Sequence, residues 1–80
     1  MLETTADHVI DLLVRMFRLA PGDVRPDVPL YRLHIDSLEL EELRLILEDE
    51  LGCDLEDVHL TSRSTVQQLL DVVGEKAAVA

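Results

Sequence analysis

This 80-residue sequence has few aromatic side chains, one cysteine and no long apolar run. Phe17 and Tyr31 are its only aromatic residues, so the core must be built mainly from Leu, Val and Ile. Cys53 has no second cysteine with which to form an internal disulfide, and we expect a reducing cytoplasm, with this thiol in a small apolar site. Without a run of about 18 apolar residues or a basic segment leading into one, we expect neither a membrane span nor a signal peptide.

Basic residues are also scarce. Seven Lys and Arg stand against 17 Asp and Glu, which gives a formal net charge of −10 at pH 7. This charge opposes binding to nucleic acid or to an anionic membrane surface and favours protein partners with basic surfaces. A chain of this size predicts a single domain over 1–80, with a core over about 5–76, a frayed C-terminal tail and no deep catalytic cleft.

The first third of the chain predicts one helix followed by a long connection. Apolar residues recur at helical spacing over about 5–19, after a possible capping box of Thr4 and Asp7. Pro21 and Gly22 should stop this helix. Two further prolines favour an ordered loop up to Asp36, which we expect five residues to fix to the core: Val24, Val28, Leu30, Tyr31 and Leu33.

Two more helices complete an all-α fold, a small bundle of three main helices with one short helical segment. The second helix should span 37–51, with an apolar stripe and Gly52 as its stop. A weak helical turn or an irregular segment is expected at 55–60. The third helix should span about 65–74 and end at Gly74, and its capping box is predicted to consist of Ser64 and Gln67.

Asp36, Ser37 and Leu38 stand where the first connection meets the second helix. This places the Ser37 hydroxyl at a helix start, where unpaired N–H groups and the helix dipole favour a phosphate group. Serine is also a good N-cap residue, so a plain capping role is the alternative on these residues alone. Six acidic residues and one basic residue then follow within the second helix.

The long connection ending in Asp36-Ser37-Leu38, the acidic second helix and Thr65-Val66 at the third helix together resemble the acyl carrier protein family. The resemblance implies that Ser37, supported by Asp36, bears a 4′-phosphopantetheine arm transferred from coenzyme A by a phosphopantetheinyl transferase with Mg²⁺. The thiol of the arm would hold an acyl or aminoacyl group. Partners implied by the resemblance are an acyltransferase or a loading ligase, and a ketosynthase or other pathway enzymes.

The resemblance also implies that partner enzymes present basic patches to the second helix. Leu38 and Leu45 lie off the apolar stripe of this helix, and we expect them to form the apolar part of that contact. The acidic part is expected to come from five residues: Glu39, Glu41, Glu42, Glu48 and Asp49.

Three departures from the common family pattern bear on the pathway. His34 stands where many carriers have glycine, either as a plain loop residue or as a titratable group near the phosphodiester. Glu41 stands where fatty-acid carriers commonly have a small apolar residue. The connection is also less generic, with Arg25, Pro26, Pro29 and Arg32. We therefore expect a discrete, monomeric carrier of polyketide or amino-acid-loading type, with a peptidyl carrier as an alternative.

Other classes of protein are less compatible with these residues. A hydrolase that used Ser37 would need a nearby base and usually a G-x-S-x-G turn, and neither is evident, so we expect no enzymatic activity. The residues around Cys53 lack the spacing of a metal site. The main rival is an unmodified acidic adaptor, which would keep Leu38 and Leu45 but would not need Ser37.

Overall fold

The computed structural model describes residues 4–79, in which helices and turns are present and β-strands are not. This confirms the predicted all-α fold. None of the helices in this range has the length and apolar composition that a membrane crossing requires. The elements in chain order are α1 (Thr5–Phe17), the 3₁₀ helices η1 (Pro21–Asp23) and η2 (Leu30–Leu33), α2 (Ser37–Leu51) and α3 (Val66–Val79).

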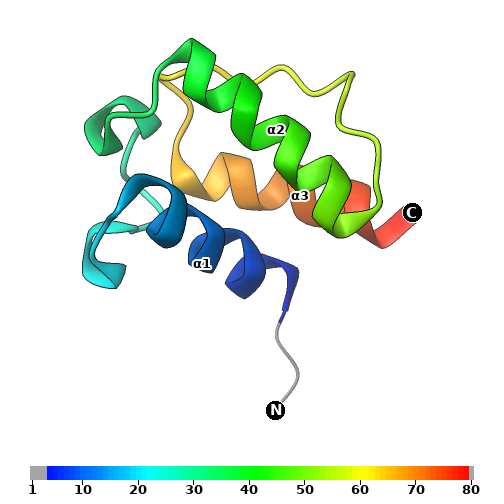
Figure 1. The fold of residues 1–80 in the computed structure, drawn as a ribbon, viewed down its shortest axis with the longest axis horizontal. Helices are drawn as coiled ribbons and strands as arrows, with labels where there is room; N and C mark the ends of the chain where they lie inside the picture. Colours follow the sequence, from blue (N-terminus) through cyan, green and yellow to red (C-terminus); the bar gives the residue numbers. More distant parts are fainter. Residues whose placement is uncertain (1–3, 80) are drawn as a thin grey trace.

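The segment between α2 and α3 runs back along α2, so α3 starts on the side of the molecule where α2 also starts (Figure 1). The core between the three helices is aliphatic, as the scarcity of aromatic residues predicts. Cys53 is buried in it, as expected. The helices contribute Val9, Leu12, Leu13, Leu40, Leu43, Leu47, Val66, Leu69 and Val73.

The first connection is fixed to the core by buried Val24, Leu30 and Leu33, but not by Tyr31, which is 53% exposed. Our prediction for Tyr31 was therefore wrong. In η2 the side chains of Leu30 and Leu33 share one face, because a 3₁₀ helix repeats every three residues. That face points into the core, and Tyr31 therefore points away from it.

Helix α1 begins as predicted and ends earlier than predicted. The Thr4 side chain accepts a hydrogen bond from the Asp7 amide at 3.1 Å, which caps the first turn. The helix ends at Phe17, since Arg18 adopts a left-handed conformation (φ 55°) and its N–H binds the Val14 carbonyl. The predicted stop at Pro21 and Gly22 thus comes after the helix has already ended.

Helix α3 differs from the prediction at both ends. Its capping box lies one residue later than expected: Thr65 Oγ1 accepts from the Gln68 amide at 3.2 Å, and Gln68 Oε1 accepts from the Thr65 amide at 2.8 Å. The helix passes through Gly74 and continues to Val79. The predicted frayed tail is therefore helical up to this residue, and Ala80 lies outside the described residues.

The segment between α2 and α3 contains no helix within the described residues. A hydrogen bond of 3.0 Å from the Val58 amide to the Leu55 carbonyl makes one isolated turn there. This corresponds to the weak turn or irregular segment expected at 55–60. The two short 3₁₀ helices lie instead in the first connection, which we had predicted to be free of helix.

Backbone hydrogen bonds join the first connection to the start of α3. Two of them use first-turn amides of α3, which have no partner inside the helix, and so they cap α3 as well as fixing the loop. The connection that leads to Ser37 is thereby held against a second segment far away in sequence. The four bonds run from Leu30 N to Ser64 O (2.9 Å), Tyr31 N to Ser62 O (2.8 Å), Val66 N to Val28 O (3.0 Å) and Gln67 N to Pro26 O (3.0 Å).

Candidate functional site

Asp36, and not Ser37, is the N-cap of α2. Its backbone is extended, and its Oδ1 accepts a hydrogen bond from the Glu39 amide at 2.9 Å. Ser37 is therefore the first residue inside the helix and has no capping role. The structure excludes the plain capping function that the sequence left open for this serine.

Ser37 is exposed at the first turn of α2, a helix of 15 residues. The Asp36 carboxylate satisfies the Glu39 amide, and the Asp36 carbonyl accepts from the Leu40 amide at 2.8 Å. Within residues 4–79 the amides of Ser37 and Leu38 have no such partner, as is usual for a first helical turn. An exposed hydroxyl beside free amides at the positive end of a helix dipole is chemically suited to carry a phosphodiester.

His34 shapes the turn that precedes the serine. It lies in the left-handed region at φ 64°, and its N–H donates to the Tyr31 carbonyl at 3.1 Å. Glycine adopts a positive φ at no steric cost, and many carriers have glycine at this position. In this chain His34 occupies the position and adopts the positive φ itself. The His34 side chain is exposed and lines a shallow hollow beside Asp36, together with Tyr31, Ile35 and Ser62.

The exposed edge of α2 carries two large apolar side chains among acidic ones. Leu38 and Leu45 are 69% and 53% exposed, and Glu42 and Asp49 are exposed as well. The spacings of four, three and four residues place these four side chains on one side of the helix. We call Leu38, Glu42, Leu45 and Asp49 the exposed stripe.

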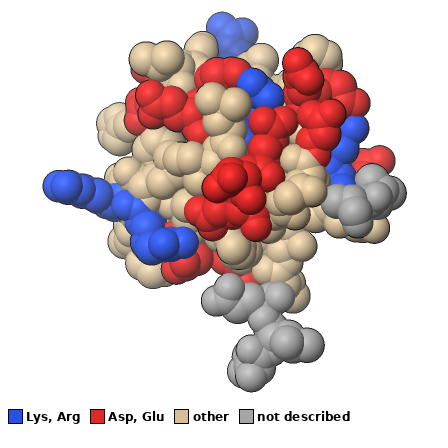
Figure 2. Space-filling model, turned by 45° about the vertical axis from the view of Figure 1, so that its right-hand side comes forward, with Lys and Arg blue, Asp and Glu red and all other residues tan. Residues whose placement is uncertain are grey.

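Among the charged side chains on the face shown in Figure 2, acidic ones prevail, and most basic ones lie toward its margins. In α2 alone six acidic residues accompany one basic residue. A basic surface approaching this face would meet little positive charge to oppose it. Glu39 contributes less than the exposed Glu42 and Asp49 to such a surface, because it is half-buried in the first turn of α2.

Glu41 and Glu48, by contrast, are engaged within the protein. Arg44 Nε donates to Glu41 Oε2 at 3.2 Å, a second Arg44 nitrogen contacts Glu41 Oε1, and a third donates to Glu48 Oε2 at 3.3 Å. Glu48 Oε2 also accepts from the Leu55 amide at 2.8 Å, which ties α2 to the following segment. We call Glu41, Arg44 and Glu48 the charged bridge. The hydrogen bond from Arg44 lowers the pKa of the Glu41 carboxyl.

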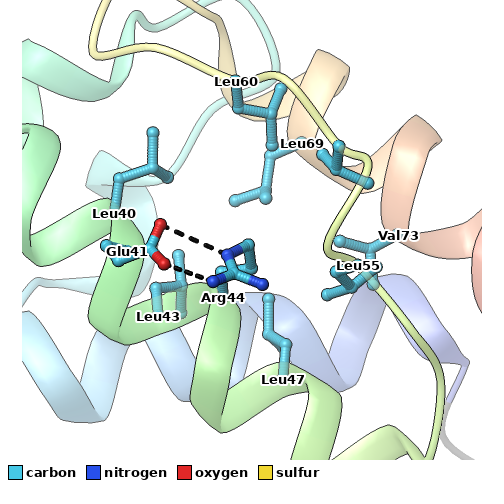
Figure 3. A pocket seen from close by; sticks show the side chains of 10 residues that line it. Leu40, Glu41, Leu43, Arg44, Leu47, Leu55, Leu60, Leu69 and Val73 are labelled. Atoms are coloured by element: carbon cyan, nitrogen blue, oxygen red, sulfur yellow. Dashed lines mark hydrogen bonds and ion pairs between the residues drawn. The ribbon is translucent and has the colours of Figure 1, made fainter.

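The charged bridge borders a small apolar cavity between α2, the segment after it and α3. Figure 3 shows the Arg44 guanidinium paired with Glu41 among aliphatic side chains from these three segments. The volume of the cavity is about 50 Å³. Its lining consists of Leu40, Glu41, Leu43, Arg44, Leu47, Leu55, Val58, Leu60, Leu69 and Val73.

Sequence reasoning missed the role of Arg44, although a local signal was present. Arg44 is the only basic residue between Ser37 and Leu51, and it lies three residues after Glu41 and four before Glu48. These are the spacings at which helical ion pairs form. The contact of Glu48 with the Leu55 amide has no comparable signal, because it joins two elements across a turn.

Residues 7–73 match the family model described as phosphopantetheine attachment site. The match covers more than four fifths of the chain, and the chain therefore belongs to this family of acyl and peptidyl carrier proteins. It is a carrier to which 4′-phosphopantetheine is attached covalently. Carriers of this family interact with modifying transferases and partner enzymes and are generally not catalysts themselves. No solved structure gives a significant match to the chain.

Proposed function

We propose that Ser37 is the attachment point of the 4′-phosphopantetheine arm and that the arm carries an acyl or aminoacyl intermediate. The observation that supports this most directly is the division of roles at the start of α2: Asp36 caps the helix and leaves the Ser37 hydroxyl exposed. When bound, the arm supplies a flexible thiol that holds the cargo as a thioester.

The residues around Ser37 contribute to attachment by binding and positioning. The free first-turn amides and the helix dipole favour the negative charge of the phosphodiester. Asp36 fixes the helix start, and His34 sets the turn before it. In the transfer reaction a bond forms from Ser37 Oγ to phosphorus, the phosphoanhydride bond of coenzyme A breaks, and 3′,5′-ADP leaves as the hydroxyl loses its proton. The transferase supplies Mg²⁺.

Partner enzymes are proposed to dock on the exposed stripe. Two exposed leucines alternate there with two exposed carboxylates, a combination that offers apolar contact area and attraction to a basic patch on the same surface. The proposed partners are the phosphopantetheinyl transferase, an acyltransferase or loading ligase, and a ketosynthase or comparable enzyme.

We place this carrier in polyketide or related specialised biosynthesis, with amino-acid loading as the nearest alternative. Two observations support a specialised role. Glu41 occupies a position that is commonly small and apolar in fatty-acid carriers, and here it is committed to Arg44. His34 replaces the common glycine. We further propose that residues 1–80 act as one monomeric, non-catalytic carrier domain in the cytoplasm.

Intact-protein mass spectrometry tests the attachment site. The unmodified protein is incubated with coenzyme A, Mg²⁺ and a broad-specificity phosphopantetheinyl transferase, beside Ser37→Ala and the matched control Ser62→Ala. Wild type and Ser62→Ala should gain one phosphopantetheine, and Ser37→Ala should gain none. Because Ser37 is not the cap, Ser37→Ala should change the free energy of unfolding by less than about 0.5 kcal/mol.

Two results would contradict the proposal. Modification of Ser37→Ala would move the attachment point elsewhere. An unchanged mass for folded wild type, with a second carrier modified in the same tube, would favour the unmodified adaptor.

A further inference from the structure

The apolar cavity beside α2 has one charged side. Eight of its ten lining residues are aliphatic, and the other two are Glu41 and Arg44. Leu43, Leu55, Leu69 and Val73 are almost completely buried, whereas the Arg44 and Glu41 side chains are 22% and 56% exposed. The charged pair, together with the partly exposed Val58 and Leu60, therefore forms the side of the cavity that faces solvent.

The cavity as it stands is too small for a long aliphatic chain. A cavity of about 150 Å³ is known to bind benzene, so the 50 Å³ available here corresponds to only about two carbon atoms. A longer chain can enter only if the walls separate or Arg44 moves out.

The charged bridge opposes both of these movements. Arg44 is held by Glu41 on one side and by Glu48 on the other. The hydrogen bond of 2.8 Å from the Leu55 amide to Glu48 then ties the α2 wall to the wall formed by the following segment. Each exposed ion pair is weak alone, but separating the walls also leaves a partly buried amide without its acceptor.

Arg44 also lies within reach of cargo attached at Ser37. The two residues are seven positions apart on α2, which corresponds to about 10 Å along the helix axis. An aliphatic chain that folds back along α2 from the proposed attachment point would pass Leu40 and then reach Glu41 and Arg44 at the solvent side of the cavity. On the basis of the proposed function, we infer that the Glu41–Arg44–Glu48 bridge closes the apolar interior to acyl chains longer than about two carbons and keeps such cargo outside the bundle.

The test compares wild type with Arg44→Ala and the matched control Arg15→Ala. Arg15 forms a comparable helical ion pair with Asp11 at 3.0 Å, on α1 and outside the cavity lining. Each protein is loaded with acetyl- or octanoyl-phosphopantetheine from the corresponding coenzyme A thioester. Intact mass confirms the loading, and hydroxylamine then measures the exposure of the thioester.

In wild type and in Arg15→Ala, the octanoyl group should be lost at a rate within about twofold of the rate for the acetyl group. In Arg44→Ala, the octanoyl group should be lost at least about fivefold more slowly than in wild type. The reason is that each buried methylene favours the enclosed state about fourfold. Protection of octanoyl already in wild type would overturn the inference. So would unprotected octanoyl in a folded Arg44→Ala protein.

A second measurement needs no loading. The unmodified proteins are titrated with 1-hexanol while the methyl resonances of Leu69 and Val73 are followed by NMR. Arg44→Ala should respond at about tenfold lower hexanol concentration than wild type and Arg15→Ala, because two or more methylenes gain access to the cavity. Equal responses would overturn the inference. Failure of loading alone would count against the proposed function, and the hexanol titration would still decide whether the bridge closes the cavity.

Discussion

Two edges of α2 carry similar acidic residues and use them differently. On the exposed stripe the carboxylates of Glu42 and Asp49 form no ion pair within residues 4–79 and stand beside exposed leucines. On the charged bridge the carboxylates of Glu41 and Glu48 are bound to Arg44. The comparison shows that the negative charge of a helix is a poor measure of the charge it offers to partners. Contact with Arg44 decides which of these four carboxylates remain available.

The largest expected effect comes from the same substitution at two leucines on different sides of α2. Leu47 is 1% exposed and Leu45 is 53% exposed. Leu47→Ala should lower the free energy of unfolding by about 2–5 kcal/mol, since it leaves a cavity in the core. Leu45→Ala should change it by less than about 0.5 kcal/mol but slow modification by the transferase. Urea denaturation and the modification rate measure these effects, and a large stability loss in Leu45→Ala would contradict an exposed docking role.

Charge reversal on the exposed stripe should give the next largest effect. The double variant Glu42→Lys/Asp49→Lys should lower kcat/KM of the phosphopantetheinyl transferase by about tenfold through slower association, with the fold intact. Added salt should lower the wild-type value in the same direction. The matched control is the double variant Asp71→Lys/Glu75→Lys, which reverses two charges on α3. Equal losses in both double variants would show that only net charge matters.

The smallest effect is the pH dependence of the charged bridge. Arg44 holds the pKa of Glu41 below its ordinary value of 4.5. The contribution of this pair to stability is therefore present above pH 4.5 and is lost as pH falls through the lowered pKa, where the unfolded chain binds more protons. Denaturation measured between about pH 3 and 6 should show a shallower slope for Glu41→Gln than for wild type. An unchanged slope would remove Glu41 from the bridge in solution.

Asp57→Asn is the comparison variant for the acid slope of stability, because Lys76 likewise lowers the pKa of the Asp57 carboxyl. This pair joins the segment after α2 to α3 at 2.7 Å and lies outside the cavity lining. Its loss should flatten the acid limb of the stability curve without changing entry into the cavity.

The sequence predicted most of the fold because helical periodicity and capping are local properties. The start of α1 at Thr5 and both bounds of α2 follow from such signals. The C-terminal ends of α1 and α3 do not follow from local signals of this kind. Arg18 adopts a left-handed conformation that its residue type does not favour, and α3 continues past Gly74 into a last turn in which Lys76 pairs with Asp57 of the preceding segment. Both depend on contacts or backbone conformations that spacing alone does not encode.

Some features of the candidate site could likewise be predicted from the sequence, and others could not. The exposure of Leu38 and Leu45 was predictable, since both lie off the apolar stripe of α2. The engagement of Glu48 was not, because its partner is a backbone amide beyond the end of the helix. The residue type of His34 gives no sign of its positive φ, and the one indirect indication is the glycine that many carriers have at this position.

Because the Asp36 side chain caps the start of α2, the proposed esterification of Ser37 would remove none of the hydrogen bonds that cap this helix. On the proposed function, attachment of the arm would then require no rearrangement of the start of α2. A pool that contains both unmodified and modified molecules would therefore be uniform in shape and in resistance to proteolysis. The unmodified and modified molecules would differ only in whether they are able to carry cargo.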